Sequence, residues 1–267
     1  MSKEFFFRND DIRDSLDDEL IQIHELFVER KVPMIHAVEP ANVTPEVVAW
    51  LLDERAKHPD VISLMQHGYD HTIKNTQKKG EFGGQRGYQE QYDDIKKGRE
   101  LMDKHLGGQW FDAFNFPYAP YNKEAIRALQ DVGYKVLNSH YNCEWKRQVL
   151  YTLGHILGKG LLFGKHVSWN HRIYPGTTMR EISMNITFIE TYHNEDTDCD
   201  FFSYEYLCNK IDQYMATPFP IGLLLHHRYH TTQESVDLIA RIFDYLEMKG
   251  CKAVSMEQIY DRIKDQP

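Results

Sequence analysis

The chain has 267 residues, 42% of them hydrophobic and 13% aromatic, with a formal net charge of −9 at pH 7. This length suits one domain with a sizeable core, and the hydrophobic content excludes a disordered chain. The negative charge, without a long cluster of Lys and Arg, argues against nucleic-acid binding through phosphate neutralisation.

The sequence predicts neither a membrane-spanning segment nor a secretion signal. No apolar run approaches the roughly 18 residues of a transmembrane helix. The first residues, "MSKEFFFRNDD", lack the apolar core of a signal peptide. The four cysteines are scattered without a CxxC pair, which is typical of free thiols in a reducing compartment. We therefore expect a cytoplasmic protein.

Short apolar runs alternate with amphipathic stretches along the first half of the chain. The run "EFFFR" predicts a strand, and apolar residues at helical spacing predict a helix over 14–31. Residues 73–87, rich in Gly, Lys and Gln, predict an exposed loop. Further strands are predicted at 33–38, 60–67, 112–118 and 134–139, and further helices from Thr44, up to His105 and at 122–133.

This alternation breaks between residues 139 and 200, where the pattern predicts strands, loops and one short helix. It resumes with a helix at 203–216, a strand at 221–227, a helix at 233–249, and "KAVSM" leading into a last helix. Alternating strands and helices predict a parallel sheet. About seven such units favour a deformed (β/α) barrel, with an irregular β-containing insertion around 139–200, as one domain over 1–267.

Polar side chains follow several predicted strands, at the ends where the chemistry of an α/β barrel gathers. Two acids end the first strand, "HGYDH" ends the third, and a histidine ends "IGLLL". These strand-end residues are Asp10, Asp11, His67, His71, Asn115, Tyr118 and His226.

The spacing of His67 and His71 would place both imidazoles on one side of a single helical turn. Two imidazoles and one carboxylate are a common ligand set for a catalytic divalent metal, although such a pair can also be exposed or simply hydrogen-bonded. A metal would offset the negative charge at the end of the first strand. One aspartate would then bind it, the other would accept a proton from water, and His226 would serve as the acid.

These segments, in this order, resemble the motifs of the NodB-homology polysaccharide deacetylases, which are metal-dependent carbohydrate esterases with a deformed (β/α) barrel. "FFFRNDDI" resembles the first motif, "HGYDH" the second, "FNFPYAPYN" the third and "LLLHH" the last. The resemblance implies a catalytic base, a metal site, an oxyanion-binding backbone N–H, a Leu in the acetyl pocket and a catalytic acid. By this resemblance, the base is Asp10 and the metal ligands are Asp11, His67 and His71. The backbone N–H is that of Tyr118, the pocket residue is Leu224, and the acid is His226.

The third motif departs from the family pattern in its charge. The family normally has an arginine that pairs with the catalytic aspartate, where this chain has Asn115. Arg8 can replace that arginine, because it lies two residues before Asp10 and so shares its face of the strand. Arg228 is a second candidate for the role.

Two other motif positions also differ. Gly68 stands where the family usually has Ser or Thr, which removes a side-chain hydrogen bond but no ligand. The fourth motif, whose aspartate orients the catalytic histidine, has no clear counterpart among Trp145, Trp169 and Asp198. The partner of His226 is therefore left open.

Several polar residues are weaker candidates for substrate binding. Trp169, in "SWNHR", could stack on a sugar ring, with a surface loop as the alternative. Arg228, in "HHRYH", could bind an anionic group, and Asn115 belongs to the predicted wall of the groove. His36 and His140 also end strands.

We therefore expect a metal-dependent hydrolase, with zinc as the cofactor, that removes an N-acetyl or formyl group from an amino sugar. A cytoplasmic location favours a glycan precursor of a surface polysaccharide, such as O-antigen or capsule. Two alternatives are kept: an allantoinase-like amidohydrolase acting on a small non-sugar amide, and a non-catalytic carbohydrate-binding protein on the same fold. The oligomeric state is left open, with a homo-oligomer allowed.

Overall fold

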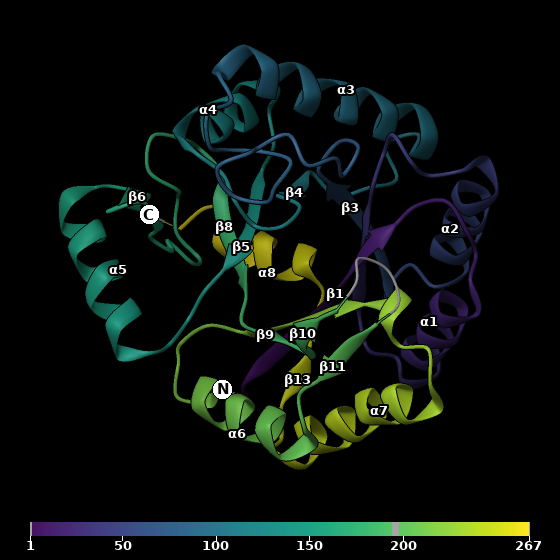
Figure 1. Ribbon diagram of the computed structural model, residues 1–267. Coiled ribbons are helices and arrows are strands. Elements are labelled where there is room, and N and C mark those ends of the chain that lie inside the picture. Colours follow the sequence, from purple (N-terminus) through teal and green to yellow (C-terminus); the bar gives the residue numbers. More distant parts are fainter. Residues whose placement is uncertain (1, 194–197, 267) are drawn as a thin grey trace.

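A ring of parallel strands surrounded by helices forms the computed structural model, which describes residues 2–193 and 198–266 (Figure 1). The strands of the main sheet pair in the order β8-β5-β4-β3-β2-β1-β12-β9. They are β1 (Glu4–Ile12), β2 (Met34–Val38), β3 (Ile62–His67), β4 (Ala113–Asn115), β5 (Val136–His140), β8 (Arg180–Met184), β9 (Ile186–Thr187) and β12 (Ile221–His226), with β13 (Lys252–Ala253) beside β1.

Helices connect the strands and cover the ring from outside. They are α1 (Asp18–Arg30), α2 (Pro45–Lys57), α3 (Tyr88–Leu106), α4 (Lys123–Val132), α5 (Trp145–Leu157), α6 (Tyr204–Met215) and α7 (Gln233–Met248), whereas α8 (Met256–Ile263) lies across one end of the barrel. Side chains of Ser, Thr, Asp or Asn at the N-cap accept a backbone N–H in α1, α2, α4, α6, α7 and α8. Thr44 is the N-cap of α2 and Gly133 is the C-cap of α4, so the predicted start of the first helix and the predicted end of the second are confirmed.

The ring closes at Asn185, the single residue between β8 and β9. Its backbone N–H donates to the Gly222 carbonyl at 2.8 Å, and its side-chain oxygen accepts from the Gly222 N–H at 2.7 Å. A Cβ at position 222 would lie 2.7 Å from the Ser183 carbonyl, so only glycine allows this close approach. Because β8 and β9 form one interrupted strand, the barrel has seven strands, and the predicted fold class is confirmed.

The three phenylalanines of β1 alternate between the two faces of the barrel wall, as strand geometry requires. Phe6 points into the barrel, where it packs with residues of α8 such as Met256. Phe5 and Phe7 point outward into the core formed with the surrounding helices, and Phe7 contacts Phe27 edge-to-face at 4.9 Å.

The structure differs from the sequence predictions in two segments. The stretch 139–200 contains the 13-residue helix α5 and the barrel strands β8 and β9, besides the hairpins β6 (Leu161–Leu162) to β7 (Lys165–His166) and β10 (Ile189–Tyr192) to β11 (Cys199–Phe201). The loop 73–87 lacks regular structure as predicted, but Glu81 and Phe82 within it are fully buried. The prediction of an exposed loop is therefore wrong for its second half.

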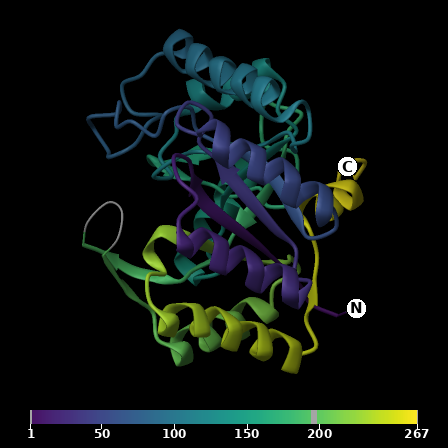
Figure 2. The ribbon, with the colours of Figure 1, turned by 90° about the vertical axis from the view of Figure 1, so that its right-hand side faces the viewer.

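The loop 73–87 and the β10–β11 hairpin project from the same side of the molecule, opposite the two chain ends (Figure 2). No helix in the described part of the chain is long and apolar enough to cross a membrane.

Candidate active site

The carboxyl ends of the barrel strands bring the predicted residues together around one cavity of about 790 Å³. β1 contributes the two acids, β3 and the turn after it contribute two histidines, and β12 contributes a third. Among the residues that line the cavity are Arg8, Asp10, Asp11, His67, His71, Tyr118, Leu224 and His226.

Asp10 and Asp11 both reach the cavity, although neighbouring residues of a regular strand point to opposite faces. The pairing of β1 with β2 shifts register between Asn9 and Ile12, and Asp11 has a left-handed backbone with φ of 64°. Aspartate tolerates this conformation better than most residues. This local bulge turns the second carboxylate to the same side as the first.

The predicted metal ligands Asp11, His67 and His71 form one compact cluster whose ligand atoms all lie within 4.8 Å of one another. Oδ1 of Asp11 is 3.1 Å from Nε2 of His67 and 3.4 Å from Nε2 of His71. Two ligand atoms that each lie about 2.1 Å from a cation are roughly 3.0–3.4 Å apart, so these spacings suit a shared divalent metal. The sequence predicts a helical turn between the two histidines, but the observed turn is not helical. Gly68 and His71 both have positive φ.

The charges in this cluster are mutually compensated. Burial would raise the pKa of Asp11, but its hydrogen bond with His67 and the charges of nearby histidines hold that pKa well below its ordinary value. Burial would lower the pKa of His67, but Asp10 and Asp11 raise it to about 9. Because metal ligands must be deprotonated, a bound cation would displace any proton from Nε2 of His67.

Asn115 lies behind the cluster and is not among the residues that line the main cavity, so its contact with substrate stays a prediction. It is buried, and its side-chain amide is 2.6 Å from Nδ1 of His67 and 3.4 Å from Oδ2 of Asp10. A partner on Nδ1 fixes the ring so that Nε2 faces Asp11.

Arg8 is the charge partner of Asp10. Its Nε lies 2.6 Å from Oδ1 and its Nη2 2.7 Å from Oδ2, and its third nitrogen contacts the side-chain oxygen of Asn138. Burial would raise the pKa of Asp10, but Arg8, His67 and His226 outweigh it and lower that pKa. Asp10 is therefore ionised near neutral pH.

His226 lines the same cavity, with its Nε2 3.9 Å from Oδ2 of Asp10. The hydroxyl of Tyr192 lies 3.4 Å from its other ring nitrogen, and the two rings pack edge-to-face. Tyr192 was not predicted, because nothing in "FIETY" marks a strand end of the barrel. It reaches the site through the β10–β11 hairpin.

Tyr118 and Leu224 both line the cavity, as predicted. Tyr118 has a left-handed backbone with φ of 60°, and its ring lies 4.5 Å from that of His71. Its hydroxyl donates to the His71 carbonyl at 3.2 Å. The segment after β4 therefore packs directly against the turn that carries the second histidine. His140, at the end of β5, also lines the cavity.

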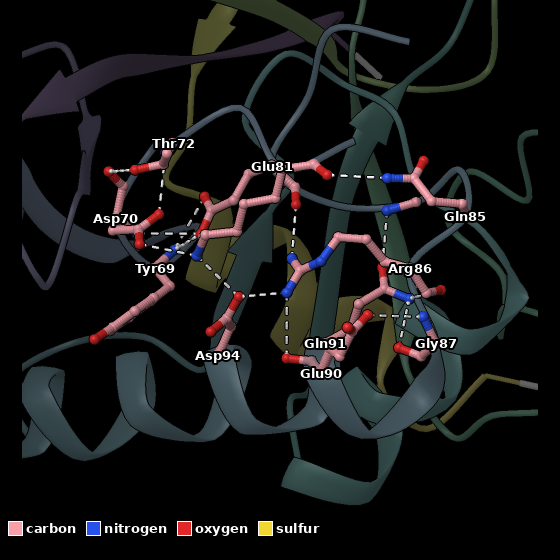
Figure 3. Close-up of polar contacts among 12 residues, drawn as sticks. Tyr69, Asp70, Thr72, Glu81, Gln85, Arg86, Gly87, Glu90, Gln91 and Asp94 are labelled. Atoms are coloured by element: carbon pink, nitrogen blue, oxygen red, sulfur yellow. Dashed lines mark hydrogen bonds and ion pairs between the residues drawn. The ribbon is translucent and has the colours of Figure 1, made fainter. Parts of the chain in front are cut away.

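A buried carboxylate supports the turn between the two histidines (Figure 3). Glu81 accepts the backbone N–H groups of Tyr69 and Asp70 at 3.0 and 3.1 Å. Gly68 cannot carry a side chain here, because a Cβ would collide with this carboxylate and with Pro117. The carboxylate of the loop 73–87 thus stands where a Ser or Thr side chain would otherwise reach.

The loop that carries Glu81 is itself fixed by charged contacts, as Figure 3 shows. Arg86 donates to the Glu81 carbonyl at 2.7 Å and to Asp94 of α3 at 2.7 Å. Lys74 bridges Asp70 and Asp94 at 2.8 and 2.9 Å. These contacts explain why a stretch with a polar composition is ordered and partly buried.

Three other predicted candidates are not among the described residues that line the cavity. The indole of Trp169 donates to the Lys159 carbonyl at 3.2 Å and packs on His155. Arg228 forms an ion pair with Asp14, so it is not the partner of Asp10. His36 is buried beside Asn9. The substrate-binding roles of Trp169 and Arg228 therefore stay predictions that the cavity does not support.

No protein-family model matches the chain, and no curated protein matches it. Solved structures do match it over nearly its whole length. A family 4 acetyl xylan esterase from Clostridium thermocellum, solved with a cobalt ion, aligns with a TM-score of 0.58 at 10% identity, covering 97% of this chain and 91% of that one.

Two further matches have the same architecture. A peptidoglycan N-acetylglucosamine deacetylase aligns with a TM-score of 0.54 at 14% identity, covering 97% of this chain and 88% of the other. A CE4 family pseudoenzyme from Bacillus anthracis aligns with a TM-score of 0.52 at 13% identity, covering 99% and 66%. The chain therefore has the fold of the CE4 polysaccharide deacetylases, as its motifs predict.

Proposed function

We propose that this protein is a metal-dependent hydrolase that removes an acetyl or formyl group from the nitrogen of an amino sugar. The observation that carries the proposal is the difference in surroundings between the two acids. Asp11 lies close enough to two imidazoles for the three groups to bind one metal ion. Asp10, beside them, is held ionised by Arg8. A metal site beside a carboxylate that does not bind the metal is typical of a hydrolase.

Asp11, His67 and His71 would hold the cation, with zinc as the expected metal. When bound, a divalent cation supplies Lewis acidity at the substrate carbonyl and lowers the pKa of water. Asp10 then accepts a proton from the attacking water, and the backbone N–H of Tyr118 donates to the oxygen that becomes negative. His226 donates a proton to the departing amine, in the orientation that Tyr192 supports.

The side chains around the cavity support a sugar as the substrate. The aromatic rings of Tyr118, Tyr192 and Tyr229 line it together with Leu224, and aromatic rings offer an apolar face and a polar edge to a sugar. We propose a glycan precursor of a surface polysaccharide as the substrate class. The acetyl xylan esterase and the peptidoglycan N-acetylglucosamine deacetylase of the same fold support a carbohydrate as the substrate.

The test combines metal analysis with a substrate panel. Wild-type protein should contain near-stoichiometric divalent metal, His67→Ala should lose it, and acetate release from N-acetylated sugars should disappear in Asp10→Asn. A wild type without metal would contradict the proposal at its first step. Ureide turnover would instead identify an allantoinase-like enzyme. Sugar binding without hydrolysis would identify a binding protein comparable to the pseudoenzyme of the same fold.

A further inference from the structure

Helix α5 exposes an apolar face to solvent. Trp145, Val149, Leu153 and Ile156 lie on one side of the helix, as their helical spacing requires. Trp145 and Ile156 are 71% and 76% exposed. The opposite side packs inward through Tyr151 and Gly154, so the helix is already docked by its other face. Figure 1 shows α5 at the periphery of the molecule, beside β6.

A second exposed apolar group stands at the tip of the β6–β7 hairpin. Phe163 is 81% exposed and has φ of 52°, a left-handed conformation that bulky residues rarely adopt. Gly or Asn would suit this two-residue turn without strain and without an apolar ring in water. The ring therefore contributes nothing to the stability of the turn, and such an arrangement indicates binding.

The charge around these apolar residues is opposite to that of the rest of the chain. Residues 145–180 contain no Asp or Glu, whereas the whole chain has a net charge of −9. The exposed basic residues of this segment are Lys146, Lys159, Lys165 and Arg172. Glu144, just before the helix, is paired with Lys210 at 3.8 Å.

We propose that the outward face of α5 and the tip of the β6–β7 hairpin dock on a lipid bilayer with anionic headgroups. An amphipathic helix with exposed Trp, Ile and Leu, flanked by Lys, lies in the headgroup region of such a surface. Each Lys or Arg near an anionic bilayer adds to the attraction. A second copy of this chain fits less well, because a symmetric contact through the same face would bring like charges together.

The β6–β7 hairpin, whose tip belongs to the docking surface, also packs close to the main cavity. His166, next to the hairpin tip, stacks on Tyr121 with ring centroids 3.7 Å apart. These two rings line a small hollow together with Arg8 and His140, which also border the main cavity. If the proposed deacetylase function holds, on which this last step rests, docking would bring the cavity to a lipid-linked amino sugar at the membrane surface.

Vesicle binding tests the docking without reference to activity. The full chain is sedimented with vesicles of phosphatidylcholine alone and with vesicles containing roughly one-third phosphatidylglycerol. Binding should be strong only to the anionic vesicles and should weaken as salt rises. Ile156→Ser with Phe163→Ser, and separately Lys159→Glu with Lys165→Glu, should each lower the partition coefficient roughly tenfold or more.

All four substituted residues are exposed, so the variants are expected to fold. Matched controls are Met248→Ser on α7, where the methionine is 69% exposed, and Lys96→Glu on α3; both should bind like the wild type. Equal affinity for both vesicle types, or wild-type binding by the Ile156/Phe163 variant, would overturn the proposal. So would a solution dimer that this variant dissociates, which would identify a second copy as the occupant. Because binding is scored by sedimentation, loss of hydrolysis alone leaves the result unchanged.

Discussion

Arg8 and Asp10, two residues apart on β1, are joined by a two-point ion pair with contacts of 2.6 and 2.7 Å. Both side chains are almost fully buried, so water screens their charges only weakly. The planar guanidinium matches the two carboxylate oxygens and fixes the orientation of the acid as well as its charge. In this chain an arginine of the first motif therefore takes the place of the one absent at Asn115.

Replacing Arg8 should impair the proposed base more than substrate binding. In Arg8→Met the pKa of Asp10 should rise, because burial is no longer opposed by the guanidinium. We expect kcat to fall about 10²–10³-fold near neutral pH, with the acid limb of kcat/KM moved to higher pH. Arg8→Lys, which keeps the charge but not the two-point contact, should move that limb less. An acid limb at the same pH in wild type and Arg8→Met would contradict the assignment.

Asn115→Leu should weaken metal binding without removing a ligand. The leucine cannot make the polar contact to Nδ1 of His67, so the ring is no longer held with Nε2 toward Asp11. Loss of such a partner typically lowers metal affinity about 10–100-fold. Competition with a fluorescent chelator measures the change. Asn115→Asp, which places a carboxylate oxygen where the amide nitrogen faces Nδ1, can accept the Nδ1–H of a metal-bound imidazole and should retain most of the affinity. Unchanged affinity in Asn115→Leu would show that the contact does not matter for the metal.

The features that could be predicted from the sequence are those that a strand or its end determines locally. The phenylalanines of β1, the acids after them and the histidine at the end of β12 follow from strand periodicity and from the meeting of parallel strands at one edge. The bulge at Asp11 could not be predicted in this way. Its left-handed backbone depends on how β1 pairs with β2, which no local pattern shows.

Other side-chain positions could not be predicted because a tertiary contact decides them. Trp169 does not line the cavity, because its indole donates to the Lys159 carbonyl at 3.2 Å and packs on His155. Arg228 forms an ion pair with Asp14 instead of with Asp10. Tyr192 reaches His226 only because the β10–β11 hairpin projects beside the cavity. None of these contacts is visible in the local sequence pattern.

Tyr192→Phe should slow the step that needs the acid. The variant keeps the edge-to-face ring contact with His226 but loses the hydroxyl that lies 3.4 Å from its nitrogen. We expect kcat to fall about fivefold with little change in KM, since one hydrogen bond to a catalytic group is worth about 1 kcal/mol. Tyr192→Leu, which also removes the ring, should be slower still. Equal kcat for Tyr192→Phe and wild type would show that the Tyr192 hydroxyl does not support His226 as the acid.

Gly68→Ala should destabilise the protein through the turn that carries both histidines. The new Cβ would collide with Glu81 and Pro117 and would also take a left-handed conformation. We expect a loss of about 1–3 kcal/mol in the free energy of unfolding, measured with urea. Gly107→Ala is the control, because Gly107 has a similar φ of 56° with no atom near the added Cβ. A loss no larger than that of the control would show that the turn can shift to accept the methyl group.

Glu81→Gln should change the pH dependence of stability. Burial raises the pKa of Glu81 to about 8 from an ordinary value of 4.5, against the opposing N–H donors of Asp70 and Tyr69. Because the folded pKa is the higher one, the unfolded chain loses this proton first as pH rises. The stabilisation is therefore complete below about pH 4.5 and is lost progressively up to about pH 8.

Glutamine resembles the protonated carboxyl group and does not titrate. The free energy of unfolding of Glu81→Gln, relative to wild type, should therefore rise steadily when both are measured in urea from about pH 5 to pH 8. The difference between the two proteins is the informative quantity, because Glu39 and His67, whose pKa values are raised to about 7 and about 9, titrate in both. A difference that stays constant with pH would mean that Glu81 is already ionised at pH 5. The turn at Gly68 would then be held by a charged carboxylate paired with Lys74, which lies 3.9 Å away.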